Sequence, residues 1–580
     1  MTRNRSFQRK VIYGSAIALL LFPLYFLGQP ASVKGGGGKL AEMRDQYKLS
    51  QGNLGDVDPA SETMKLVTLG MRPFATVYLW EKANTYKKKN DWDNLAATLN
   101  QITKLDPNIV SVWEFQAHNL SYNVSVEFDD YRYRYLWVKR GIDFLIQGTH
   151  YNRNEPRLLW NVGWFVGHKM GRSDEKLQFR RLFRRDEDFH RDLQDMGEIS
   201  VESPDAQGPD GRPDSWLVSR LWYGEAEKAV NQGRPLRGKS PLMFYADGPM
   251  ARINYSMAIE DEGILDEKAQ IAWEKAGEDW RRYGDRSVPH TAGHLVRIND
   301  LPKLIARRDD MQEQLDELIP GARQAIIAEK RAKLSEEIKV ALDTPITRRT
   351  PEQHMQVQMA EANMGVSPLE IADRAPEDVK SKARALAERL YEFELVDVQH
   401  TNMYRSQVNY DYWETRCAME GTAEAVAARR HLFEAEKFLE AADLEAAKKS
   451  YEASWDLWAE LFARHPRILD DITVSDIKEP LNRYADVLKQ LDQKMPADFK
   501  LRPLWDRMQR MNNPQATPEP PLNSDAFKPL PSELPKDDAK PDAKTEKVEK
   551  PGDAKSEKPS EAKTEKPADA KSEKPDEAKK

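Results

Sequence analysis

An apolar residue recurs every three to four positions along most of this chain, and that period limits the fold more than any other feature. The runs GARQAIIAEKRAKLSEEIKVAL (321–342) and APEDVKSKARALAERLYEFELV (375–396) show it most clearly. Such a period places apolar side chains on one face of an α-helix, whereas the alternation typical of a half-buried strand is rare here. The sequence therefore predicts an all-α fold between residues 59 and 513.

Residues 79–108, LWEKANTYKKKNDWDNLAATLNQITKLDPN, contain a helix hairpin whose spacing fits a tetratricopeptide repeat, a 34-residue pair of antiparallel helices. If Thr76 takes the first position, a small residue falls where the two helices approach most closely, and a proline ends the second helix. The matching positions hold Ala83, Tyr86, Trp92, Leu95, Leu99, Ile102 and Pro107. We interpret this stretch as one unit of a helical-repeat solenoid, although Leu95 is larger than the alanine usual at its position.

A second unit begins at Val110, 34 residues after Thr76, and Trp113, Ala117 and Leu120 take its expected positions. The second helix of this unit is delayed, so we predict an insertion at residues 121–135 within the hairpin. Further along, Gly163 and Gly167 lie one helical turn apart and predict close packing of their helix against a neighbour. Five tryptophans fall on apolar helical positions and are interpreted as core residues, with an aromatic-lined groove as the alternative: Trp80, Trp113, Trp137, Trp160 and Trp164.

The same patterns predict how the chain is divided. Pro- and Gly-rich breaks at 201–215, 233–249 and 343–353 separate the helical runs. The predicted segments are a flank and transmembrane helix (1–28), a flexible linker (29–58), tetratricopeptide-like repeats (59–200), a second helical segment (201–345), a C-terminal helical region (346–513) with a further hairpin at 428–466, and a tail (514–580). Whether the helices within 320–400 pair with a second copy of the chain is left open.

Both ends of the chain differ from its helical middle. The basic segment MTRNRSFQRK precedes a charge-free run from Val11 to Gly28, which as a helix would span roughly 27 Å, about the thickness of a bilayer core. The run predicts a transmembrane anchor; a cleaved signal peptide is the alternative, although GQPASVKG offers no small-x-small cleavage site. From residue 514 apolar residues nearly vanish and units such as AKSEKPSE recur, which predicts a disordered tail.

One group of residues is predicted to bind a partner. The stretch VEFDDYRYRY within the insertion combines carboxylates, guanidinium groups and aromatic rings, and a lengthened loop in a regular repeat often carries recognition. The residues are Tyr122, Glu127, Asp129, Asp130, Tyr131, Arg132 and Arg134. A second interpretation is that these charges pair with one another while the rings begin the buried face of the next helix.

The sequence predicts no catalytic residue, cofactor site or metal site. Cys417 is the only cysteine, which excludes an intramolecular disulfide and cysteine-based clusters, and no local base indicates a nucleophilic role. His290 and His294 in HTAGH would share a helical face, but the neighbouring Pro289 and Gly293 favour a polar loop. A net charge of −7 gives no basic field for nucleic acid.

The run from QGNLGDVDPASETMKLVTLGMR through LWEKANTYKKKNDW and VWEFQAHNLSYNVSVEFDDYRYRYLWVKRGIDFLIQGTHYNRNEPRLLWNVGWFVGHKMGRSDE resembles an uncharacterised family of large membrane-anchored proteins of planctomycete bacteria. The resemblance covers roughly residues 40 to 300. It implies a Gram-negative envelope and a tetratricopeptide-like region, and it implies no reaction. Some members bear the label "iron-responsive element", which a chain with one cysteine does not support through cluster ligation.

These observations together predict a non-enzymatic scaffold. The chain would cross the inner (cytoplasmic) membrane once, with its bulk in the periplasm because the basic flank stays cytoplasmic. The repeats would hold envelope proteins or peptides, and the tail would contact the cell wall. Two alternatives stay open: an accessory subunit of an envelope transport or export complex, and a carbohydrate-binding or enzymatic module with its site near residues 122–135.

Overall fold

The structure is a computed structural model that describes residues 3–28, 39, 43, 72–196, 199–345, 349–470 and 472–511. All of these belong to one compact unit, residues 1–528; the other unit comprises residues 529–580. The predicted tail lies outside the described residues, as does the predicted linker apart from residues 39 and 43. Among the residues that are described, no helix is long and apolar enough to cross a membrane.

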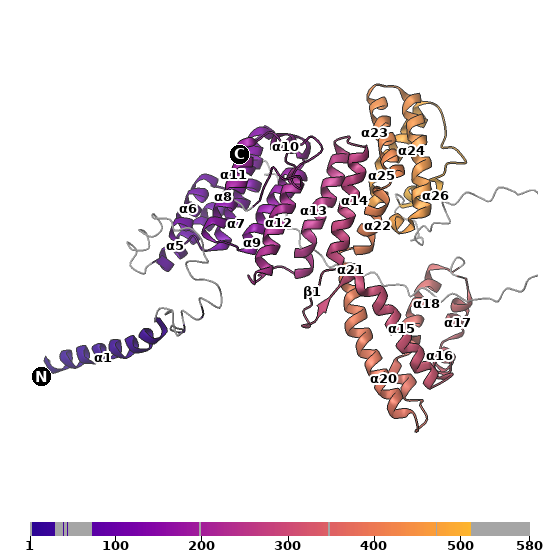
Figure 1. The fold of residues 1–580 in the computed structure, drawn as a ribbon, viewed down its shortest axis with the longest axis horizontal. Helices are drawn as coiled ribbons and strands as arrows, with labels where there is room; N and C mark the ends of the chain where they lie inside the picture. Colours follow the sequence, from indigo (N-terminus) through magenta and orange to yellow (C-terminus); the bar gives the residue numbers. More distant parts are fainter. Residues whose placement is uncertain are drawn as a thin grey trace, which may run out of the picture. The chain divides into compact units, whose positions relative to one another are not determined.

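The described chain is almost entirely helical, which confirms the all-α prediction (Figure 1). Its first half contains α1 (Arg3–Gly28), α5 (Arg72–Lys88), α6 (Trp92–Leu105), α7 (Val110–His118), the π-helix η1 (Asn119–Val124), the 3₁₀-helix η2 (Ser125–Glu127), α8 (Tyr131–Tyr151), α9 (Pro156–Trp164), the π-helix η3 (Phe165–Lys169), α10 (Lys176–Phe183), α11 (Glu187–Met196), α12 (Ser215–Asn231), α13 (Pro241–Asp261) and α14 (Glu267–Gly284).

A short antiparallel hairpin of β1 (Val288–Pro289) and β2 (Leu295–Val296) follows α14. The second half contains the 3₁₀-helix η4 (Ile298–Asp300), α15 (Leu301–Leu318), α16 (Ala322–Ala332), α17 (Glu336–Asp343), α18 (Pro351–Met364), α19 (Pro368–Ala372), α20 (Lys380–Phe393), the π-helix η6 (Glu394–Gln399), α21 (His400–Gln407), α22 (Tyr410–Glu420), α23 (Ala423–Glu440), α24 (Leu444–Arg464), the 3₁₀-helix η7 (Pro466–Asp470), α25 (Ile472–Gln490) and α26 (Arg502–Met511).

Two predicted hairpins, α5–α6 and α23–α24, turn in the same way although they lie far apart in the sequence. Each turn has one left-handed residue, Asn90 (φ 54°) or Ala442 (φ 59°), followed directly by an aspartate that caps the next helix. The backbone N–H of Asp91 donates to Tyr86 and that of Asp443 to Phe438, five residues back in both cases. Most residues at the repeat positions are buried: Ala83, Leu95, Leu99 and Ile102 of the first hairpin and Ala435, Ala447, Tyr451 and Ser454 of the second. Tyr86 and Trp92 are half-buried, and Phe438 is 39% exposed.

The predicted insertion at 121–135 is not an extended loop. The helix that starts at Val110 continues through η1 and η2 to Glu127, and α8 begins after a three-residue turn. Ser121 and Ser125 are buried, and Ser125 Oγ donates to the Ser121 carbonyl at 2.6 Å. The delay in the apolar pattern therefore reflects a longer helix pair, because π-type turns shift the register without ending the helix.

Gly163 and Gly167 allow α9 and η3 to lie closely against α12, as predicted. A Cβ at Gly167 would lie 2.7 Å from Ser219 Oγ and 2.8 Å from the Trp216 ring. Ser219 Oγ also donates to the Gly163 carbonyl at 2.6 Å. The break predicted at 201–215 falls in the loop between α11 and α12. That predicted at 233–249 was too long, because α13 starts at Pro241 and contains Pro249.

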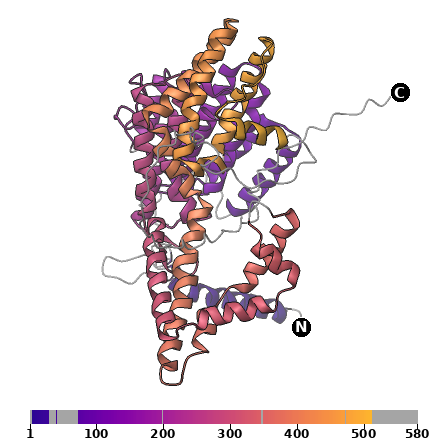
Figure 2. The ribbon, with the colours of Figure 1, turned by 90° about the vertical axis from the view of Figure 1, so that its right-hand side faces the viewer.

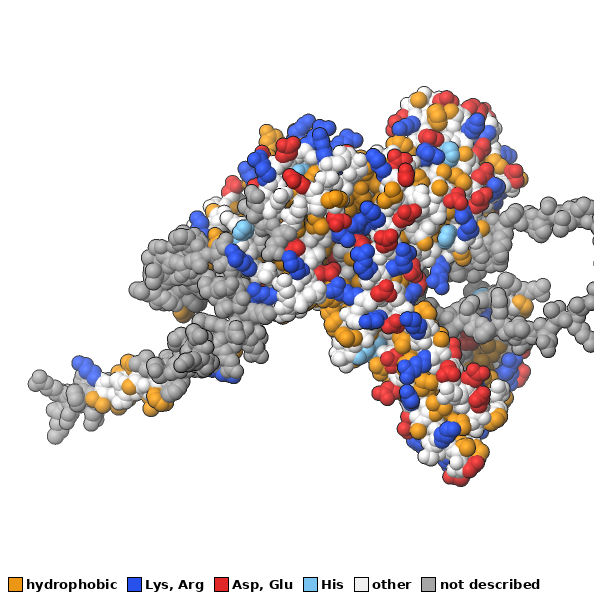
Figure 3. All heavy atoms as spheres, viewed as in Figure 1, with side chains coloured by type: hydrophobic (Ala, Val, Ile, Leu, Met, Phe, Trp, Pro, Cys, Tyr) orange, Lys and Arg blue, Asp and Glu red, His pale blue; other side chains and the backbone are white. Residues whose placement is uncertain are grey.

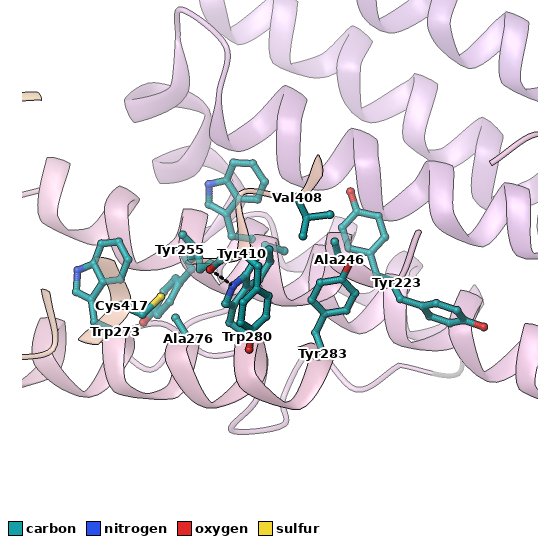
Figure 4. Packing of buried hydrophobic residues seen from close by; sticks show 14 of the residues in the cluster. Tyr223, Ala246, Tyr255, Trp273, Ala276, Trp280, Tyr283, Val408, Tyr410 and Cys417 are labelled. Atoms are coloured by element: carbon teal, nitrogen blue, oxygen red, sulfur yellow. Dashed lines mark hydrogen bonds between the residues drawn. The ribbon is translucent and has the colours of Figure 1, made fainter. Parts of the chain in front are cut away.

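The five tryptophans interpreted as core residues differ in burial. Trp113 and Trp160 are buried, whereas Trp80, Trp137 and Trp164 are only half-buried. The largest aromatic cluster instead joins α12, α13 and α14 to α21 and α22. There Trp280 Nε1 donates to the Tyr410 carbonyl at 3.1 Å, and Cys417 packs among the same rings (Figure 4).

Residues 301–398 have a hydrophobic core of their own, formed by α15, α16, α19, α20 and η6. Helices α15 and α20 lie side by side within it (Figures 1 and 2). This section leaves the rest of the chain after η4 and returns through η6 into α21. We call the two connections between this section and the rest of the chain, one outgoing and one returning, the two crossings. They contact each other, since Arg405 Nη1 donates to the Ile298 carbonyl at 3.1 Å.

Candidate functional site

The charged residues predicted to bind a partner mainly hold their own backbone in place. Asp130 caps α8 by accepting from the Arg132 N–H at 2.7 Å. Arg134 Nε donates to the Phe128 carbonyl at 2.5 Å, and its guanidinium pairs with Glu175. Only Arg132 and Asp130 pair within the stretch, at 3.5 Å, whereas Arg134 pairs outside it, so the second interpretation describes part of the contacts.

The remaining predicted residues spread over three elements. Trp92 Nε1 donates to Glu127 on η2 at 3.3 Å, while Asp129 is exposed in the turn before α8. On η1 the ring of Tyr122 stacks on His118 with centroids 4.5 Å apart, and Lys169 Nζ lies 3.9 Å from its centroid. Tyr131 begins α8 with Arg132 over its ring. Six of the seven residues lie at or beside the turn between η2 and α8, whereas Tyr122 lies on η1, and none of the seven lines either cavity described below.

A larger hollow lies on the face of α12, α13 and α14, and we call it the α12–α14 groove. Its volume is about 610 Å³, and its lining includes Arg220, Gly224, Tyr245, Asp279 and Arg282. Figure 3 shows basic and acidic side chains intermixed over the part of the molecule where α13 and α14 lie. Apolar and aromatic residues, Leu221, Pro249 and Tyr283, complete the lining.

The side chain of Asp279 contacts three arginine side chains. Its carboxylate is 2.7 Å from Arg220 Nε, 2.9 Å from Arg252 Nε and 3.3 Å from Arg282 Nη1. Arg282 is 70% exposed, so its guanidinium keeps most of its donors for solvent or a ligand. Arg252 also pairs with Asp205, and Glu225 and Asp285 line the groove as well, so basic and acidic groups are mixed here.

At the other end Arg286 bridges two helices. Its Nη1 donates to Glu227 Oε2 at 2.7 Å, and its guanidinium lies 3.7 Å from the centroid of the Tyr245 ring. Burial raises the pKa of Glu227, and the neighbouring Arg286 opposes that rise. The ion pair of Arg286 and Glu227 is therefore partly shielded from water, which strengthens the attraction between its two charges.

Two glycines line the groove, of which Gly224 is exposed and Gly248 is buried. A Cβ at Gly224 would meet nothing within 4 Å, and one at Gly248 would meet only Glu227 and Tyr223 at 3.7 and 3.9 Å. Pro249 lies inside α13 and has no N–H, so the Tyr245 carbonyl lacks its usual intrahelical donor. Tyr245 and Pro249 both line the groove, and Tyr245 is 8% exposed.

A second, smaller cavity of about 210 Å³ has Trp216, Tyr223 and Trp413 in its wall. Asp247, which also lines it, accepts from Trp160 Nε1 at 2.6 Å, and burial raises its pKa to about 6. Burial also lowers the pKa of His168 to about 4, so this ring is neutral at pH 7. The cavity admits a few atoms rather than a peptide.

Sequence reasoning missed the groove. Gly224, Gly248 and Pro249 were the available signal, since glycine and proline inside a helical pattern mark close approach or exposed backbone. Gly248 and Pro249 were instead assigned to a break between helices. The groove residues come from three helices, and only their packing brings Arg220, Tyr245 and Asp279 together.

No protein-family model matches this chain, and no curated protein matches it either. The resemblance to the planctomycete family stays a prediction.

Proposed function

We propose that this protein is a non-enzymatic scaffold of stacked, tetratricopeptide-like helix hairpins that holds a partner protein by binding an extended segment in the α12–α14 groove. The groove carries the proposal: it has room for several residues and an exposed guanidinium at Arg282. The matching turns of α5–α6 and α23–α24 support repeated hairpins as its frame.

Residues 122–134, predicted to bind a partner, help to choose between a protein and a carbohydrate as the partner. Its aromatic rings already contact His118, Lys169 and Arg132, which leaves less ring surface for stacking on a sugar. That observation favours a protein partner over the carbohydrate-binding alternative. It does not bear on the accessory-subunit alternative, in which the partner would be a multi-span membrane protein.

The cellular place in this proposal is the inner membrane, with the helical hairpins in the periplasm. It rests on the sequence alone, namely the charge-free run from Val11 to Gly28 after a basic flank. Membrane fractionation with carbonate extraction tests it. Recovery of the full chain in the soluble fraction would overturn the anchor and leave the groove proposal standing.

Two substitutions in the groove test the scaffold proposal. Arg282→Glu reverses an exposed charge, and Gly224→Phe fills space that is open around its Cβ. Arg384→Glu is the matched control, because Arg384 is a similarly exposed helix arginine with an acidic neighbour, on α20.

The full-length protein and each variant are purified from gently solubilised membranes, and co-purifying proteins are quantified by mass spectrometry. We expect a partner that both groove variants lose by about 10-fold or more and that the control retains, as for a central binding residue. A partner retained equally by all variants would show that the groove is not its binding site, and the absence of any partner would overturn the scaffold.

A further inference from the structure

The sequence HTAGH forms a tight turn between β1 and β2. The backbone N–H of His290 donates to the His294 carbonyl at 2.8 Å, and that of Gly293 donates to the His290 carbonyl at 3.0 Å. Gly293 has φ +89°, a conformation in which a glycine is favoured. The turn folds the two histidines back on each other, with ring centroids 4.7 Å apart, although neither lies on a helix.

A third histidine meets them from far along the sequence. His400 is the first residue of α21, and its Nδ1 lies 3.3 Å from Nε2 of His294. Its ring stacks on that of His290 with centroids 4.1 Å apart. One ring nitrogen from each of the three histidines lies within 4.8 Å of the other two. All three side chains are half-buried.

The separation of His294 and His400 is the one that a metal ion requires. Two imidazole nitrogens bound to a tetrahedral Zn²⁺ at about 2.0–2.1 Å lie roughly 3.3 Å apart. Neutral imidazole is the form that binds a metal ion. Three nitrogen ligands without a carboxylate favour Zn²⁺ and neighbouring transition metals over Ca²⁺ or Mg²⁺.

We propose that His290, His294 and His400 form a binding site for one divalent transition-metal ion of the zinc type. His290 Nδ1 accepts a hydrogen bond from the Ala292 N–H at 3.1 Å, so metal binding requires this ring to exchange that bond or turn. The ligand nitrogens lie up to 4.8 Å apart, so some must approach by about 1.5 Å to reach the spacing around an ion. The rings of His290 and His294, which stack at 18° and 14° to His400, must also turn so that their nitrogens face one point. The fourth coordination position of a tetrahedral ion would be taken by water or by another ligand.

The position of the site in the fold indicates what the ion would do. His290 and His294 lie on the crossing that leaves α14 for residues 301–398, and His400 lies on the crossing that returns from them. Tyr404 Oη, which donates to the Pro289 carbonyl at 3.3 Å, already joins the hairpin to α21, and β1 lies beside α21 in Figure 1. A metal ion here would fasten the two crossings together and restrain the section whose core is separate.

Metal binding to the full chain tests the proposal. The purified, chelator-treated protein is titrated with Zn²⁺ against a chromophoric chelator, and with Co²⁺ alone as a spectroscopic probe of coordination geometry. The variants are His294→Ala and His400→Gln. His354→Ala on α18 is the control for histidine binding in general, because His354 is outside the cluster.

We expect one tightly bound ion per chain, with affinity reduced about 100-fold or more by either ligand variant and unchanged in the control. The visible absorption of bound Co²⁺ should disappear in the same two variants. Circular dichroism verifies that each variant is folded, and His290→Gln replaces any that is not. An ion bound equally by the wild type and the ligand variants, or no ion bound at all, would overturn the site.

Discussion

Replacing Gly167 with alanine should loosen the contact of η3 with α12, and the structure gives the magnitude. The new Cβ would lie 2.7 Å from Ser219 Oγ and 2.8 Å from the Trp216 ring, whereas carbon atoms in favourable contact are about 3.5–4.0 Å apart. Ser219 is held by its hydrogen bond to Gly163 and Trp216 is buried, so neither can move freely.

Overpacking of this kind costs about 1–3 kcal/mol, and the higher helix propensity of alanine returns about 1 kcal/mol. We therefore expect a net loss of up to about 2 kcal/mol in local stability. Gly224→Ala on α12 is the matched control: its Cβ meets nothing within 4 Å, so the same change should stabilise α12 by about 1 kcal/mol.

Hydrogen exchange followed by mass spectrometry is the appropriate assay, because a chain with several cores need not unfold in one step. Peptides covering α9, η3 and α12 should exchange about 10-fold faster in Gly167→Ala, and those of α12 more slowly in Gly224→Ala. If Gly167→Ala exchanges as slowly as the wild type, the close approach of these helices is wrong.

Four further predictions follow from buried groups and one strained turn. Arg429→Met leaves the buried Glu420 with only Arg416 as a partner, and should destabilise the α22–α23 region by about 3–5 kcal/mol in the same exchange assay; a loss below about 1 kcal/mol would contradict this. The pKa of Asp247 is raised by burial from 3.8 to about 6, so its contribution to stability is full below pH 3.8 and is lost as the pH rises through 6. Asp247→Asn should remove that loss, about 3 kcal/mol at pH 7, and an unchanged dependence of unfolding on pH would refute the cause. Burial raises the pKa of the Cys417 thiol to about 12, so alkylation at pH 8 should require denaturant, and rapid labelling of the native protein would show that the thiol is accessible. Ala442→Gly should stabilise the α23–α24 turn by about 1 kcal/mol, because alanine at φ 59° is strained; unchanged or faster exchange there would contradict this.

Much of the local structure could be predicted from the sequence. The spacing of Ala83, Leu95 and Leu99 indicated which face of each helix is buried, and the structure buries those side chains. Gly163 and Gly167 indicated a close helix contact, which α12 provides. These features depend on neighbours within one or two helical turns, so the pattern of residues alone is sufficient.

The register of the second hairpin could not be predicted in the same way. A delay in the apolar pattern fits either a loop or a helix with a π-type turn, and the hydrogen bonds of residues 119–127 decide for the helix. The break assigned to 233–249 failed similarly, because Pro249 is accommodated within α13. Both outcomes depend on the pattern of backbone hydrogen bonds, which the side chains alone do not determine.

The sequence by itself determined the helical class, the hairpins and their buried faces, because each follows from residues a few positions apart. Only the tertiary structure placed His400 against His290 and His294, and Asp279 against Arg220 and Arg252. The histidines converge where two chain crossings more than 100 residues apart meet, and the groove forms where three helices pack. Contacts of this kind depend on how the apolar faces stack on one another, and no local period in the sequence specifies that arrangement.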